Sequence, residues 1–194
     1  MNPTEENLSK PKVSVRFFNS NDSEDFVRLK EIVESPNVKK WMADLRGMGP
    51  RHYRDWMDER GQYNYYTFAV VLADPTHPLY DKPQGFIYIY PSDLERGTLE
   101  VSFAKHPGAP SGLIKPALRV ALLKVAEYYG KKTGRTNPPL KVIAEIEPDN
   151  EPSRRVVWGA GFEEDEEYEE DNDIYVLNWD RLKEIESVYQ GIIV

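Results

Sequence analysis

Residues 140–162 constrain the fold more than any other part of the chain. Residues 140–146 are mostly apolar, which predicts a buried strand in the centre of a sheet. The stretch EPDNEPSRRVVWGAGF follows, and it predicts a short helix whose first amides are capped by Asn150 or Ser153. Gly161 can adopt the left-handed conformation that ends a helix and lets Phe162 return to the core. In a chain of 194 residues, we expect one compact α/β domain.

Alternating or β-branched patterns predict further strands on both sides of this segment. The strands before it are expected at residues 13–17, 66–72, 84–90 and 98–104, and one strand after it at 174–177. The second and third of these form a hairpin with a long connection. The acidic stretch between residues 163 and 173 predicts a strand and a turn with a solvated face.

Helical spacing of apolar residues predicts a helix that starts at residues 21–23 and ends at Pro36. Two short helices are expected within residues 37–60, broken at 47–50. A long helix carries apolar residues from 114 to 129 and is closed by Gly130 and Gly134. These patterns predict a single domain over residues 13–180, between a flexible start at 1–12 and a helical tail at 181–194.

Composition excludes several classes of function. The chain has no cysteine, so disulfides, thiolate metal sites and cysteine nucleophiles are absent. A net charge of −8 argues against a protein that binds nucleic acid through its backbone and favours cationic or amine-bearing partners. No apolar run is long enough for a membrane span, and residues 1–12 have no apolar core like that of a signal peptide, so we expect a cytoplasmic protein. The three histidines are scattered without metal-ligand spacing, so no metal is expected.

The order of the expected elements, with a long helix between the fourth and fifth strands, resembles that of the GNAT superfamily of N-acetyltransferases. In that family a strand is followed by Asn, by a small residue three positions later, by a short helix and by Gly-Phe. Asn150, Ser153, Gly161 and Phe162 match these positions. The resemblance implies a mixed, mostly antiparallel sheet of about seven strands flanked by helices. It also implies transfer of an acetyl group from acetyl-coenzyme A to a primary amine of a small molecule or a peptide, and leaves a homodimer open.

The resemblance places the pyrophosphate of the cofactor on backbone amides between the fourth strand and the long helix. Of the three defining positions of the family's loop, Gly112 alone matches, while Ala109 and Ile114 occupy the other two. Pro116 predicts that the helix begins near Lys115, with the amides of residues 111–114 available to an anion and with Lys105, His106 and Lys115 nearby as positive charges. The alternative is a strand-to-helix turn without a ligand. The predicted cofactor-binding residues are Phe103, Ala104, Lys105, Gly108, Ala109, Ser111, Gly112, Leu113, Ile114, Asn150 and Ser153.

Glu100 is the predicted catalytic residue. In the strand TLEVSFA, Glu100 and Ser102 share the face opposite Leu99 and Val101, and members of the family carry a general base at the position of Glu100. An ion-paired structural glutamate is the alternative, with Glu145 and Glu147 as reserve candidates for the base. The family often has a tyrosine in the later helix that protonates the departing thiolate, but Val157 stands at that position, beside Trp158.

Aromatic side chains are dense in and after the two short helices, and they can attract an ammonium group. Glu167, Glu169, Glu170 and Asp171 could meet further amines of a cationic acceptor. The alternative is that these aromatics form core and these acids a solvated face. A second hypothesis for function is a catalytically silent domain that binds an acyl-CoA or a protein partner. The predicted acceptor-binding residues are Trp41, Tyr53, Trp56 and Tyr66.

Overall fold

A single seven-stranded sheet forms the centre of the molecule. The structure is a computed structural model that describes residues 12–42, 50–58, 65–94, 97–134, 141–166 and 172–189. The strand order is β1-β2-β3-β4-β5-β7-β6, and every neighbouring pair is antiparallel except β4 and β5, which are parallel. The predicted mixed, mostly antiparallel sheet is therefore confirmed. The strands are β1 (Val13–Phe17), β2 (Tyr66–Leu72), β3 (Pro83–Pro91), β4 (Leu99–Lys105), β5 (Val142–Ile146), β6 (Phe162–Glu164) and β7 (Asp173–Leu177).

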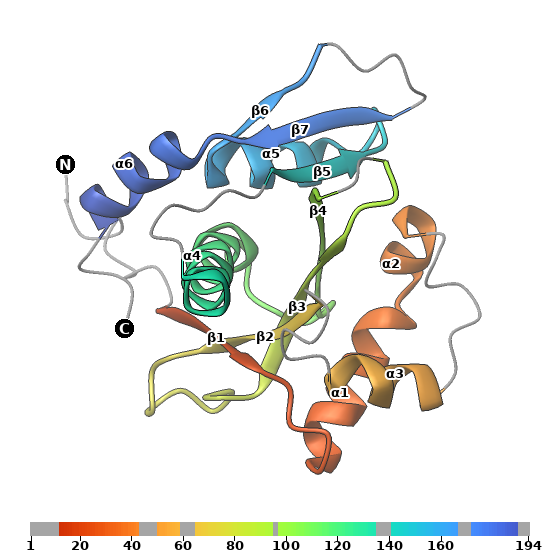
Figure 1. Ribbon diagram of the computed structural model, residues 1–194. Coiled ribbons are helices and arrows are strands. Elements are labelled where there is room, and N and C mark those ends of the chain that lie inside the picture. The colour runs from red at the N-terminus through yellow and green to blue at the C-terminus, as the bar shows by residue number, and fades with distance from the viewer. Residues whose placement is uncertain are drawn as a thin grey trace, which may run out of the picture.

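Helices cover both faces of this sheet. Figure 1 shows α1, α2 and α3 on one side of the strands and α4 on the other. Side chains of α4, α5 and α6 share one buried cluster with Phe68 and Val142, whereas side chains of α1 and α3 share a second cluster with Phe18 and Phe86. We call these surfaces of the sheet the α4 face and the α1 face. The helices are α1 (Ser23–Val33), α2 (Pro36–Trp41), α3 (Pro50–Met57), α4 (Ile114–Thr133), α5 (Glu151–Ala160) and α6 (Trp179–Tyr189).

Three predicted helix boundaries need correction. Pro36 does not end the first helix: α1 already ends at Val33, and Pro36 is the first residue of α2, where a proline lacks only an amide that would be unbonded anyway. Gly130 lies inside α4, and Gly134, with a φ of 67°, ends it. The C-terminal helix begins at residue 179 rather than 181. Of the break expected at residues 47–50, Pro50 is described as the first residue of α3; residues 47–49 and most of the N-terminal stretch lie outside the described residues.

A partly buried ion pair fixes α1 to the sheet. The side chain of Asp25 is buried, and its two oxygens accept hydrogen bonds of 2.6 and 2.8 Å from the guanidinium of Arg16 in β1. Arg16 also donates to the side chain and the carbonyl of Asp81, in the connection between β2 and β3. These contacts raise the pKa of Arg16 further above its usual value. The start of α1 is thus held at a set position on its face of the sheet.

None of the helices in the described part of the chain is long and apolar enough to cross a membrane.

Candidate functional site

The strands β4 and β5 separate soon after they pair. The register joins only Leu99 to Val142 and Glu100 to Ile143, after which β4 stays paired with β3 and β5 with β7. Figure 1 shows β5 and β7 running across the direction of β4. Past Glu100, therefore, β4 and β5 form no hydrogen bonds with each other. The backbone N–H and C=O groups on their facing edges are available to a ligand that carries amides. We call this gap the β4–β5 opening.

Helix α4 begins at the end of β4, past the wide end of the opening. Leu113 precedes the helix without a side-chain cap, and among the described residues no acceptor is found for the amides of Ser111, Gly112, Leu113 or Ile114. Gly112 is exposed, has a φ of 79°, and a Cβ placed on it would meet nothing within 4 Å. Unbonded amides at the start of a helix attract anions. Ser111 and Gly112 are exposed, whereas Leu113 and Ile114 are buried in the core, and contact of this half of the loop with a pyrophosphate stays a prediction.

The backbone amides in the first half of the loop are bonded within the protein. The amide of Gly108 donates to Nδ1 of His106 at 3.0 Å, and the amide of Ala109 donates to the carbonyl of His106 at 2.9 Å. Gly108 and Ala109 therefore offer no unbonded amide, and their predicted contact with the cofactor stays a prediction. Lys105 donates to the carbonyl of Ala109 at 3.2 Å, so its ammonium also stabilises the loop.

Asn150 and Ser153 form the start of α5 as their sequence predicts. The side-chain oxygen of Asn150 accepts from the amide of Ser153 at 3.4 Å, and Gly161 ends the helix with a φ of 103°. Phe162 follows and is fully buried. The capping interpretation is confirmed, and contact of Asn150 and Ser153 with a cofactor stays a prediction.

Glu100 belongs to a polar cluster on the α1 face. Tyr90 lies opposite Glu100 in the β3–β4 register, and its hydroxyl donates to Oε1 of Glu100 at 2.5 Å. The same hydroxyl lies 3.3 Å from Oγ of Ser102. Leu99 and Val101 join the core on the other face, which confirms the predicted alternation of β4. Glu100 is half-buried at the narrow end of the opening, so a carboxylate and a phenol stand where the two strands part.

The predicted acceptor residues do not lie together. Trp56 packs on Tyr88, with ring centroids 4.7 Å apart, and Tyr88 in turn stacks on Tyr90 at 4.7 Å. Tyr53 is buried in the same cluster, and burial raises the pKa of its phenol. Tyr66 lies on the α4 face, fully buried, so it stands across the sheet from Trp56. Trp41 is half-buried at the end of α2, with the ammonium of Lys40 3.8 Å from its ring centroid.

The two aromatic residues beside Glu100 were missed by the sequence interpretation. Tyr88 and Tyr90 alternate on β3, so a shared face was predictable. Their position opposite Ser102 and Glu100 depends on the hairpin register, which the sequence does not reveal. Together with Trp56, they form an aromatic wall beside the catalytic candidate.

The remaining candidates for proton transfer lie apart from this cluster. Glu145 is exposed on β5, where its carboxylate accepts from the side chain of Asn172 at 2.6 Å. Glu147 is also exposed. In α5, Val157 is buried and Trp158 packs against Tyr175, so this helix supplies no phenol. Within the described part of the chain, no group of three or more histidine or acidic side chains could hold a metal ion.

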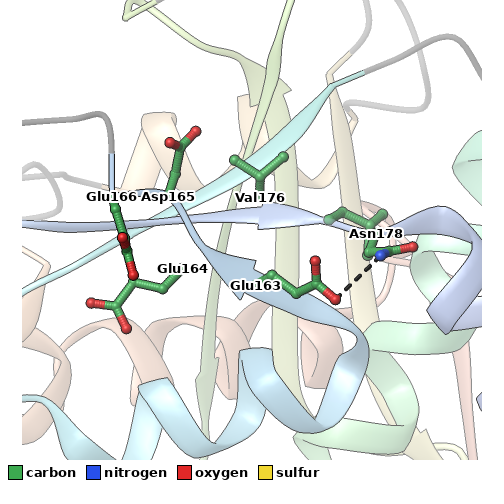
Figure 2. Close-up of a pocket in the computed structure, with 7 residues that line it drawn as sticks. Glu163, Glu164, Asp165, Glu166, Val176 and Asn178 are labelled. Carbon is green, nitrogen blue, oxygen red and sulfur yellow. Dashed lines mark hydrogen bonds between the residues drawn. The ribbon is translucent and has the colours of Figure 1, made fainter.

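A separate acidic hollow lies at the edge of the sheet formed by β6 and β7. Figure 2 shows the four consecutive acids Glu163–Glu166 around it, with Val176 of the neighbouring strand β7 and with Asn178, which follows that strand. Asn178 donates to Glu163 at 3.2 Å. The hollow does not include Glu100 or the α4 loop, and the acids expected to meet amines, residues 167–171, lie outside the described residues.

Comparisons with known proteins agree with this geometry. Residues 13–163 match the model of the acetyltransferase (GNAT) domain. The structure of the aminoglycoside acetyltransferase AAC(6′)-Ib in complex with paromomycin and acetyl-CoA is similar, with a TM-score of 0.65 and 14% identity over 89% of this chain and 96% of that one. A GNAT-family acetyltransferase from Bacillus anthracis has a TM-score of 0.58 and 20% identity over 86% of this chain and 94% of that one. A putative acetyltransferase from Salmonella typhimurium with acetyl-CoA has a TM-score of 0.53 and 16% identity over 85% and 91%. No curated protein sequence matches the chain.

Proposed function

Because the chain belongs to the acetyltransferase (GNAT) family, we propose that it transfers an acetyl group from acetyl-coenzyme A to a primary amine of a small molecule or a peptide. The observation that carries this proposal is the β4–β5 opening, which has Glu100 at its narrow end and the unbonded amides of the α4 loop past its wide end. A cofactor and a base can therefore meet at one point.

The proposed path of the cofactor follows the open edge of β4. Its pyrophosphate lies on the amides of residues 111–114, and its pantetheine arm runs along the edge of β4 towards Glu100. The distance from Lys105 back to Glu100 is roughly 16 Å, at about 3.3 Å per residue of strand. An extended arm with amide groups can bond to the exposed backbone over that length. The presence of acetyl-CoA in structures of two similar proteins supports this cofactor.

The proposed reaction is direct attack of a neutral amine on the thioester. The amine nitrogen bonds to the carbonyl carbon, Glu100 accepts a proton from that nitrogen, and the carbon–sulfur bond breaks to release the coenzyme A thiolate. Tyr90 bonds to Glu100, so its hydroxyl holds the carboxylate towards the α1 face, from which the acceptor approaches. The described residues place no phenol on α5, so the thiolate leaves without an acid from that helix.

That missing phenol also favours a second candidate function. A GNAT domain without catalysis would bind an acyl-CoA or a protein partner and would tolerate Val157 at this position. An acetyltransferase would release free coenzyme A when an amine is added, whereas a non-catalytic domain would not.

Calorimetry with acetyl-coenzyme A, followed by a thiol-release assay over a panel of amines, tests the proposal. We expect acetyl-CoA to bind and at least one amine to release free coenzyme A together with an N-acetylated product seen by mass spectrometry. Binding without release by any amine would support the silent domain. No heat at millimolar ligand would exclude both an acetyltransferase and an acyl-CoA binding domain.

A further inference from the structure

His106 joins the cofactor loop to α1. It lies where β4 ends, and its backbone amide donates to the carbonyl of Gln84 at 2.8 Å. One ring nitrogen, Nδ1, lies 3.0 Å from the amide nitrogen of Gly108. The other, Nε2, lies 3.0 Å from Oε2 of Glu31 and 3.0 Å from Nη1 of Arg28, both in α1. A single half-buried ring thus contacts two elements far apart in the sequence.

These contacts select one form of the ring. An amide always donates, so Nδ1 must be unprotonated to accept from Gly108. The neutral ring then carries its proton on Nε2, which donates to the carboxylate of Glu31. In the other tautomer the proton is on Nδ1, and Nε2 could accept from Arg28. The Nδ1–H would then face the N–H of Gly108, and the unprotonated Nε2 would face the carboxylate of Glu31, so both of these contacts would be unfavourable. The contacts with Gly108 and Glu31 favour the proton on Nε2, and only the contact with Arg28 favours the proton on Nδ1.

The bond to Gly108 separates the loop into two halves. The first half is held by the side chain and carbonyl of His106 and by the bond from Lys105 to the carbonyl of Ala109. The second half, residues 111–114, has amides for which the described residues offer no acceptor. Core packing holds Leu113 and Ile114, so the bonds of the first half act on the direction in which Ser111 and Gly112, the exposed residues between the two, present their amides.

We propose that His106 is a positioning residue for the cofactor: its neutral Nδ1 holds Gly108, and this fixes the loop in the shape that presents residues 111–114 to the pyrophosphate. The inference rests on the proposed function, because it takes the loop as the binding site of coenzyme A. A loop that is already ordered loses less conformational entropy when the ligand binds.

Two substitutions separate the contacts of the ring. In His106→Asn, the side-chain oxygen can occupy the position of Nδ1 and still accept from Gly108, while the contact with α1 is lost. In His106→Gln, the amide nitrogen can occupy the position of Nε2 and donate to Glu31, while the acceptor for Gly108 is lost. Glu31→Gln, in α1, is a control that leaves Nδ1 unchanged.

We expect His106→Gln to bind coenzyme A roughly 3- to 10-fold more weakly by calorimetry, because a loop that is no longer held must be ordered on binding, and to raise KM for acetyl-CoA without changing kcat. His106→Asn and Glu31→Gln should stay within about 2-fold of the wild type, since both keep the bond to Gly108. Melting temperatures are compared to show that all variants fold. A loss in His106→Asn equal to that in His106→Gln, or no loss in either, would overturn the role of His106 while the proposed function stands.

Nuclear magnetic resonance of the cofactor-free protein provides a second test. The ring nitrogen shifts should show the proton on Nε2, and the amide of Gly108 should exchange slowly in the wild type and in His106→Asn but faster in His106→Gln. A proton found on Nδ1 overturns the inference without any reference to coenzyme A. Failure of the wild type to bind coenzyme A would overturn the proposed cofactor site itself, which the calorimetry reports separately.

Discussion

Glu100 is the residue on which catalysis is expected to depend most. Glu100→Gln keeps the shape of the side chain and its place opposite Tyr90, but the amide cannot accept a proton. Loss of a general base costs about 100-fold to 10,000-fold in rate, and we expect a fall of this size in kcat at pH 7 with an unchanged Kd for acetyl-CoA. The rate should recover partly at high pH, where the free amine needs no base. Turnover against pH with an active amine measures both effects.

Glu145→Gln is the matched control for this substitution. Glu145 lies on the neighbouring strand, on the same face as Glu100, since Ile143 pairs with Glu100 and side chains two residues apart share a face. It is exposed and bonded to Asn172. We expect its loss to leave kcat within about 3-fold, as for surface changes. If kcat fell in Glu145→Gln and stayed near the wild-type value in Glu100→Gln, the base would be Glu145.

Tyr90 should influence the proton transfer to Glu100 without accepting the proton itself. Tyr90→Phe removes the donor to Glu100 but keeps the ring that stacks on Tyr88. A hydrogen bond to a carboxylate stabilises its ionised form, so the acidic limb of the pH–rate profile should move to higher pH in this variant. We expect kcat to fall by roughly 10-fold, less than for Glu100→Gln. A profile identical to that of the wild type would show that Tyr90 serves only in packing.

At the scale of elements, the start of α4 should determine cofactor affinity. Gly112→Asp adds a side chain and a negative charge beside the amides of residues 111–114, so we expect coenzyme A to bind at least about 10-fold more weakly. Gly97→Asp is the matched control, because Gly97 also has a positive φ, 89° against 79°, and also has nothing within 4 Å of a built Cβ. It lies at the other end of β4, roughly 26 Å from Lys105 along the strand.

The two variants carry the same charge change and similar backbone strain, so their difference in calorimetry isolates the effect on the ligand. Gly112→Asn, which adds a side chain of similar size without charge, divides that effect into steric and electrostatic parts. Equal affinities for Gly112→Asp and Gly97→Asp would place the pyrophosphate away from this loop.

The approach of α4 to the sheet depends on Gly85 in β3. A Cβ on this residue would lie 2.6 Å from the carbonyl oxygen of Ala104 and 2.9 Å from Cδ1 of Ile114, the first residue of α4. Gly85→Ala must therefore shift β4 or the start of the helix, and overpacking of this kind costs about 1–3 kcal/mol. We expect a lower melting temperature and weaker binding of coenzyme A. Gly159→Ala serves as the control for the melting temperature, because the three atoms nearest to its added methyl all belong to the flexible side chain of Lys115.

Helix bounds and caps could be predicted from the sequence where they depend on residues that are close together in the chain. The bounds and caps of α5 follow from Asn150 and Gly161, because a cap is a contact within one turn. Pro36 was misinterpreted because proline suits both the end of one helix and the start of the next. The bonds of His106 to Glu31 and of Tyr90 to Glu100 join different elements, so they depend on tertiary packing and register that one sequence does not contain. Tertiary packing also decides that Tyr66 lies on the opposite face of the sheet from Trp56, so the sequence alone did not separate these two residues.

At the scale of the whole molecule, the sheet separates two approaches to the reaction. The α4 loop and α5 lie towards the α4 face, whereas Glu100, Tyr90 and the aromatic wall with Trp56 lie on the α1 face. The β4–β5 opening is the place where these two strands are no longer paired, and we expect the two substrates to meet there. Cofactor and acceptor can therefore be bound at the same time, each from its own side.

This arrangement predicts a sequential kinetic mechanism. The chain contains no cysteine, so a thioester of the enzyme cannot form, and the acetyl group should pass directly to the amine. Initial rates at several fixed amine concentrations should give intersecting lines in double-reciprocal plots against acetyl-CoA. A dead-end analogue such as desulfo-coenzyme A should compete with acetyl-CoA but not with the amine. Without an amine, labelled coenzyme A should not exchange into acetyl-CoA. Parallel lines, together with such exchange, would reveal an acetyl-enzyme intermediate and would contradict direct transfer between two substrates bound at the same time.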